Sequence, residues 1–178
     1  MEERPVMAEN DRIARLAKQI DSEIRKEQRL LMTEAEALAL RRKGAADLHA
    51  ICAGFAASVN QHLSLPALEL TPSEYAPENF RESGMNLVQL NAQGRIIQIA
   101  FGATRETLST EKFLIPYILE GEVRAFNQEM LQRVQIRSQS LFYCLEDNQN
   151  VWRYIEWLNG RTGVFGRDQL VSLLERLV

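Results

Sequence analysis

Cysteine is scarce in this sequence, which has only Cys52 and Cys144 among its 178 residues. Both lie in apolar segments far apart in the chain, so we expect two buried free thiols in a reducing compartment rather than a disulfide. His49 lies three residues before Cys52, but a zinc site needs three or four ligands and no further ligand is suitably spaced. Core packing is therefore expected for both residues, and no metal or cofactor is predicted.

Long apolar runs are also missing. No stretch of about 18 apolar residues occurs, so no transmembrane helix is predicted. Residues 1–12 are charged and lack an apolar region, so no secretory signal is expected. The formal net charge of −3 gives no electrostatic reason to expect nucleic acid. These absences predict a cytoplasmic protein that binds neither membrane nor nucleic acid.

Short motifs of known catalytic sites are absent as well. The sequence has no Gly-x-Ser-x-Gly elbow and no Gly-Lys-Ser/Thr triplet. His49 and His62 are about 220° apart around a helix, so their rings do not converge. These absences favour a protein that is not an enzyme, although a site assembled from residues distant in sequence leaves no such signature.

The stretch NGRTG at 159–163 has the small residues of a phosphate-binding loop but not its context. A phosphate loop leads directly into a helix, whereas here residues 164–167 come before the next helical pattern. Asn-Gly between two β-type segments is a strong hairpin signal, because the central residues of such a turn need positive φ. We therefore predict a turn between two strands.

Residues 11–63 have the apolar periodicity of a helix, with steps of three, four and seven. Unbroken, this helix would be about 80 Å long, which is wider than a domain of this size. One break signal is a capping box that begins at Thr33. The other is the run of cations before Gly44, which is typical of a helix end. We favour a bend near Thr33, with the second helix continuing through Gly44 and Gly54.

The arm before this bend carries an apolar stripe that one domain cannot cover along its whole length. An exposed stripe of this size favours association, so a homodimer is predicted. The candidate interface residues are Ile13, Leu16, Ile20, Ile24 and Leu31. The alternative is an arm that folds back at Thr33 as an intramolecular hairpin and buries the same residues without a partner.

Residues 85–165 contain five β-type segments joined by short polar links. Such links cannot make parallel crossovers, so a five-stranded antiparallel meander is predicted. The stretch 63–80 contains three prolines and is expected to be an irregular connector. A last helix, with Asp168 as its expected N-cap, should pack on the sheet. Its apolar face consists of Leu170, Leu173, Leu174 and Leu177.

Charged and aromatic residues alternate along two of these segments, at the period of two that places them on one face of a strand. The candidates for a binding surface are Trp152, Tyr154 and Glu156 in one segment and Glu120, Glu122 and Arg124 in another. If the two strands are neighbours, one face carries aromatics among charges, as interface anchors often do. The alternative is half-buried aromatics beside solvated carboxylates. Neither face of segment 151–157 is cleanly apolar, which indicates that both faces of the sheet are partly covered.

These patterns predict an α+β fold with a long N-terminal helical segment, an antiparallel meander sheet and a C-terminal amphipathic helix. Residues 1–32 are expected to form the arm and residues 33–178 a single domain. The favoured function is a non-catalytic protein-interaction module, homo-oligomeric and adaptor- or chaperone-like. The alternative is a small-molecule-binding protein or small enzyme, whose pocket between sheet and helices would converge on Glu120, Glu122 or Glu156.

Overall fold

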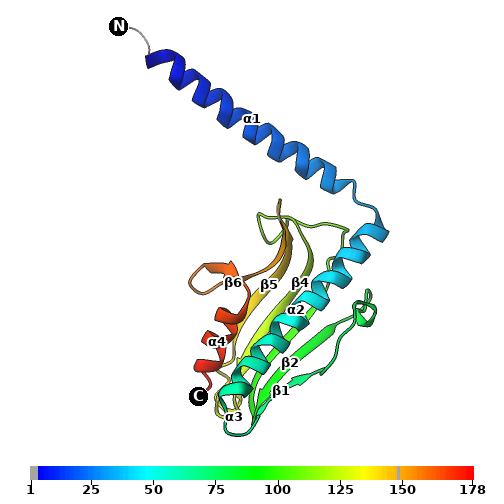
Figure 1. Ribbon diagram of the computed structural model, residues 1–178, viewed down its shortest axis with the longest axis vertical. Coiled ribbons are helices and arrows are strands. Elements are labelled where there is room, and N and C mark those ends of the chain that lie inside the picture. The colour runs from blue at the N-terminus through cyan, green and yellow to red at the C-terminus, as the bar shows by residue number, and fades with distance from the viewer. Residues whose placement is uncertain (1–3, 148) are drawn as a thin grey trace.

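The computed structural model describes residues 4–147 and 149–178, and it has helices at both ends of an antiparallel sheet (Figure 1). The helices are α1 (Arg4–Leu30), α2 (Glu34–His62), α3 (Gln128–Gln132) and α4 (Arg167–Glu175), with a 3₁₀ turn η1 at Pro77–Asn79. The strands are β1 (Leu68–Thr71), β2 (Asn86–Ala92), β3 (Arg95–Ala103), β4 (Tyr117–Phe126), β5 (Arg137–Leu145), β6 (Asn150–Glu156) and β7 (Arg161–Val164). Helices α2 and α4 cover one face of the sheet, here called the inner face, while α1 projects away from it.

The chain bends between α1 and α2 at Thr33, as the capping signal predicts. The Thr33 hydroxyl accepts a hydrogen bond from the Glu36 backbone N–H at 3.2 Å. In return, the Glu36 carboxylate accepts one from the Thr33 backbone N–H at 2.9 Å. This reciprocal pair satisfies two N–H groups that a helix start otherwise leaves free. Helix α2 then runs without interruption through Gly44 and Gly54.

The sheet has seven strands rather than the five expected from the sequence. They lie side by side in chain order, β1 to β7, and every neighbouring pair is antiparallel. The two additional strands are the edges. Strand β1 lies within the proline-rich stretch that was expected to be irregular, and β7 follows the Asn-Gly turn. Both have only four residues, which is too short to show an alternating pattern.

The NGRTG stretch is a hairpin turn, as predicted, but its loop has four residues rather than two. The register pairs Glu156 with Arg161, so that residues 157–160 form the connection. The Gly160 N–H donates to the Glu156 carbonyl at 2.8 Å. Of Asn159 and Gly160, only Gly160 has a positive φ, of 68°. The glycine is therefore required by the backbone of the turn, and the stretch is explained without a bound anion.

Helix α4 packs beside α2 on the inner face, as expected for an amphipathic last helix. Leu170, Leu173 and Leu177 are buried in the main core. The N-cap residue is Gly166, whereas Asp168 lies in the first turn, so the predicted cap is wrong by two residues. A carboxylate in the first turn still interacts favourably with the positive end of the helix dipole.

Helix α2 approaches the sheet closely at Gly44. The Trp152 indole N–H donates to the Gly44 carbonyl at 2.8 Å. A Cβ atom at Gly44 would lie 2.5 Å from Cδ1 of Tyr143. The ring of Tyr143 therefore occupies the space that any larger residue at position 44 would need.

The opposite, outer face of the sheet is covered in part by the loop between β3 and β4. Phe113 and Ile115 of this loop pack against Tyr117, Phe142 and Cys144, which form a second, smaller apolar cluster with Ile155. The rings of Phe113 and Phe142 stack with their centroids 5.3 Å apart. This partial cover explains why neither face of segment 151–157 is cleanly apolar.

The contact at Gly44 predicts opposite effects for two substitutions on the same helix. Gly44→Ala should lower the free energy of unfolding by about 1–2 kcal/mol, because overpacking outweighs the helix preference of alanine. Gly54→Ala should raise it by about 0.5–1 kcal/mol. The nearest atom to a Cβ at Gly54 is Nη2 of the flexible Arg167, at 3.6 Å. Urea unfolding measures both values, and an increase for both variants would contradict the close packing at Gly44.

Candidate interaction site

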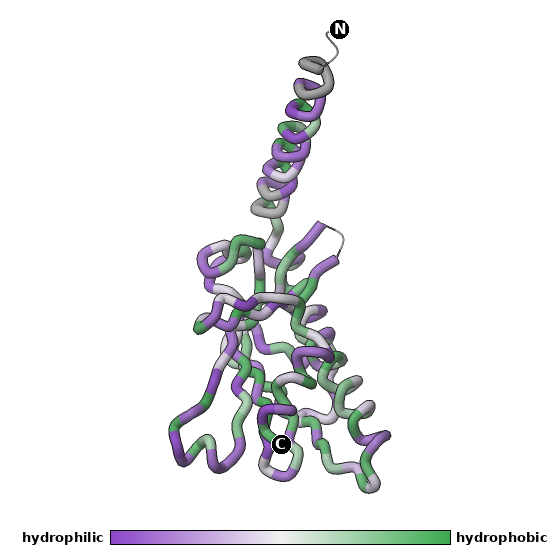
Figure 2. The backbone as a smooth tube through the Cα atoms, turned by 90° about the vertical axis from the view of Figure 1, so that its left-hand side faces the viewer, coloured by the Kyte–Doolittle hydropathy of each residue, from purple (hydrophilic) through white to green (hydrophobic). Residues whose placement is uncertain are grey.

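Helix α1 carries an exposed apolar stripe. The four members within the helix have exposed fractions of 45–57%, and the exposed fraction of Leu31, just after the helix, is 80%. At 100° per residue the five residues lie within about 80° of the helix circumference and extend over about 27 Å. The stripe consists of Ile13, Leu16, Ile20, Ile24 and Leu31. Figure 2 shows hydrophobic positions recurring along the projecting helix.

The part of the chain that the structure describes leaves this stripe exposed. An ion pair between α1 and the body of the protein, residues 33–178, joins Arg25 to Asp147 at 3.4 Å, and both side chains are more than half exposed. On the helix circumference Arg25 lies about 140° from the centre of the stripe, so the contact leaves the apolar face open. The intramolecular hairpin considered from the sequence is therefore not adopted, because α1 extends away from α2 (Figure 1).

The structure divides the six sheet residues proposed for binding between the two faces. Trp152, Tyr154 and Glu156 lie on the inner face and are buried. Glu120, Glu122 and Arg124 lie on the outer face of β4, and β5 separates the two strands. The six side chains therefore do not form one surface, and a binding role for either group stays a prediction.

The inner group makes contacts within the fold. Trp152 holds the Gly44 carbonyl, and its ring packs edge-on against Phe101 with centroids 5.5 Å apart. The Glu156 carboxylate accepts a hydrogen bond from the Asn159 amide at 2.8 Å and pairs with Arg176 at 3.6 Å. A buried carboxylate with such partners is typical of a structural position.

The outer group forms a polar strip that is accessible to solvent. Arg124 pairs with Glu122 at 3.1 Å, and Lys112 pairs with Glu120 at 3.3 Å. Partial burial acts to raise the pKa of Glu122, but hydrogen bonds from Ser138 and Arg124 and the charge of Arg124 together hold it below its ordinary value. Glu122 is therefore a stable anion on this face rather than a candidate general acid.

Trp157 is an outer-face aromatic that the sequence reasoning did not select as a candidate. Its indole N–H donates to the Ser140 hydroxyl at 2.7 Å, and 60% of the residue is exposed. The alternation along segment 151–157 does indicate this placement. Trp157 lies five residues after Trp152, and an odd separation along a strand puts two side chains on opposite faces. An exposed tryptophan held by one hydrogen bond is a common interface anchor.

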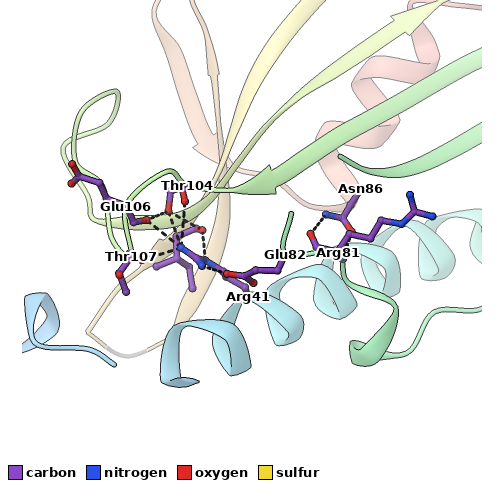
Figure 3. Close-up of polar contacts among 8 residues, drawn as sticks. Arg41, Arg81, Glu82, Asn86, Thr104, Glu106 and Thr107 are labelled. Carbon is purple, nitrogen blue, oxygen red and sulfur yellow. Dashed lines mark hydrogen bonds and ion pairs between the residues drawn. The ribbon is translucent and has the colours of Figure 1, made fainter. Parts of the chain in front are cut away.

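The sequence reasoning also missed Arg41, whose side chain is only 7% exposed (Figure 3). Its guanidinium pairs with Glu82 and donates to the Ile118 carbonyl at 3.1 Å. It also donates to the Thr104 hydroxyl and to the carbonyls of Thr104, Glu106 and Thr107, at 3.2–3.5 Å. With its donors engaged in this way, Arg41 joins α2 to the loop after β3 rather than offering a ligand-binding cation.

A shallow pocket of about 500 Å³ lies beside this loop, and Glu120 belongs to its lining. Neither Glu122 nor Glu156 does. The other lining residues are Thr104, Arg105, Glu106, Leu108, Ser109, Thr110 and Glu111. Small-molecule pockets are mostly apolar, so this polar lining gives the small-molecule hypothesis little support, and the hypothesis stays a prediction.

The cysteines and His49 behave as core residues. Cys52 and Cys144 are free and buried, as expected from the sequence. Burial raises the pKa of each thiol to about 12. His49 is also buried; its Nε2 lies 2.7 Å from the Pro72 carbonyl oxygen and its ring stacks on Tyr75. In the described part of the chain, no three His, Cys, Asp or Glu side chains are grouped as metal ligands.

Substitution of Arg41 should destabilise the fold. Arg41→Met should lower the free energy of unfolding by at least about 2 kcal/mol, because several buried carbonyls lose a charged donor. Lys43→Met is the matched control and should cost less than about 0.5 kcal/mol, since its pair with Asp47 is exposed. Equal urea midpoints for the two variants would mean that the Arg41 contacts contribute nothing in solution.

Both thiols should resist modification in the folded protein. A pKa of about 12 leaves roughly a thousandth of the thiolate that an ordinary cysteine has at pH 8, and burial also blocks access. A chromogenic disulfide reagent at pH 8 should react slowly with the native chain. In urea, where the chain is unfolded, the reagent should react rapidly with both cysteines. Rapid reaction of either thiol without denaturant would contradict its burial.

No helix in the described residues combines the length and the apolar composition that a membrane crossing requires. Comparisons with protein-family models, curated proteins and solved structures find no match for this chain.

Proposed function

We propose that this protein is a non-catalytic interaction module of an adaptor- or chaperone-like kind, which assembles with a second copy of itself through α1. The observation that carries the proposal is the apolar stripe, whose five residues, four on α1 and Leu31 just after it, are exposed in the described part of the chain. A helix of this kind gains most of its stability when its apolar face packs against another element. The partner supplies that surface.

The charge of α1 suits a second copy better than a strongly acidic or basic partner. Between residues 9 and 29, the acidic residues are Glu9, Asp11, Asp21, Glu23 and Glu27, and the basic ones are Arg12, Arg15, Lys18, Arg25, Lys26 and Arg29. These near-equal numbers of opposite charges allow two identical helices to approach without net repulsion. The apolar stripe, present on both copies, then forms the common seam.

The body of the protein supports this arrangement by leaving α1 free. Helix α2 and the sheet bury their apolar residues against one another, so α1 is not needed to complete the core. The contact between Arg25 and Asp147 lies away from the stripe and involves exposed charges, which contribute little energy. An arm held outside the core in this way is available to a partner.

Substitution on the stripe should separate the copies. At tens of micromolar the full chain should have twice the 20.4 kDa mass of one chain in light scattering. Ile20→Asp places a charge in the seam and should give the monomer mass. Ser22→Asp is the matched control, because it adds the same residue on the opposite side of α1 and should leave the dimer intact.

A monomeric mass for the unmodified chain would refute self-association. A dimer that survives deletion of residues 1–32 would instead place the interface on the sheet. The outer face around Trp157 would then be the surface to test, because Trp152 and Tyr154 are buried under the helices.

A further inference from the structure

A second surface, at the end of the sheet remote from α1, has the features of a small-ligand site. A pocket of about 480 Å³ lies where α3 and the start of β5 meet the end of α4. This volume is in the range of pockets that hold small organic ligands, and the pocket is more open to solvent than the one beside the loop between β3 and β4. The lining residues are Met130, Gln135, Ile136, Arg137 and Arg176.

The lining has two cations and no carboxylate. Arg137 is exposed and has no hydrogen bond or ion pair with any side chain that the structure describes. Arg176 pairs with the buried Glu156 at 3.6 Å, which holds its guanidinium near this corner. A carboxylate is the natural counter-ion, since the planar guanidinium can bind both of its oxygens.

A buried polar group lies on β5 close to this corner, although it does not line the pocket itself. Gln139 is two residues after Arg137 on β5, so both residues belong to the same face of the strand. The Gln139 amide oxygen accepts from Gln169 of α4 at 2.8 Å, but its amide nitrogen has no partner among the described residues. Buried donors rarely stay unpaired, so the Gln139 amide nitrogen is a position that a bound water or ligand could satisfy.

The pocket also has apolar lining residues, and the backbone between them is strained. Met130 and Ile136 supply apolar side chains to the lining. Between them Val134 has a φ of 55°, which is rare for a β-branched residue. The turn is closed by the Gln135 N–H, which donates to the Met130 carbonyl at 2.9 Å. Strained backbone of this kind is often found at ligand sites, where it positions the side chains that follow.

We propose that this corner binds a small carboxylic acid with an aliphatic chain. Arg137 and Arg176 bind the carboxylate, and the chain lies against Met130 and Ile136. The site is independent of α1 and of self-association, so each proposal can fail without the other.

Sodium decanoate, below its micelle concentration, is the probe for this site. Titration of the full chain followed by amide NMR should show saturable shifts at residues 130–139 and near Arg176. Decanol lacks the charge and acetate lacks the chain, so both should bind at least about tenfold more weakly. Shifts confined to α1 would show binding to the apolar stripe instead and would overturn the proposal.

Arg137→Gln removes the exposed cation without disturbing the core, and should weaken decanoate binding about tenfold or more. Arg105→Gln is the matched control, because it removes another exposed arginine in the loop after β3. Circular dichroism of both variants is the control for correct folding. Equal affinity of the Arg137→Gln variant and the unmodified chain, or equal binding of decanol and decanoate, would contradict the assignment.

Discussion

The close contact between α2 and the sheet is the constraint on which the rest of the structure depends. Gly44 allows the helix to approach the ring of Tyr143, and the Gly44 carbonyl accepts the Trp152 hydrogen bond. One turn earlier, Arg41 joins the same helix to the loop after β3. These contacts fix α2 across the inner face and fill that face with packed side chains. The surfaces that we propose for interaction therefore lie on α1 and at the corner between α3 and α4, and the outer face is the remaining candidate.

Much of this architecture could be predicted from the sequence because its signals are local. The capping box at Thr33 identifies the bend, and the alternating segments identify the five longer strands. The edge strand β1 could not be predicted in the same way, and β7 was indicated only by the Asn-Gly turn before it, not by an alternating pattern. Each has four residues, and β1 lies between prolines. Their existence depends on pairing with a longer neighbour, which a local pattern does not contain.

The candidate sites were harder to predict, because the period of two shows which residues share a face but not which face that is. Trp152 and Tyr154 do share a face, as expected, but it is the one buried beneath the helices. The opposite parity brings Trp157 to the outer surface. The helix that carries the stripe was easier to predict, because a helical period over many residues is a stronger signal, while the role of the stripe as an interface stays a prediction. Arg41 had no such signal, since its partners lie between 41 and 77 residues away.

Every strand pairing joins neighbours in the chain, so each step of sheet assembly closes only a short loop. Loop-closure entropy rises with chain separation, and topologies rich in local contacts fold faster than those that depend on distant pairings. The docking of the helices is the exception, because the hydrogen bond between Trp152 and Gly44 spans 108 residues and α4 contacts both α2 and β3. The entropy of chain closure is therefore concentrated in the packing of α2 and α4 onto a sheet whose strands pair locally.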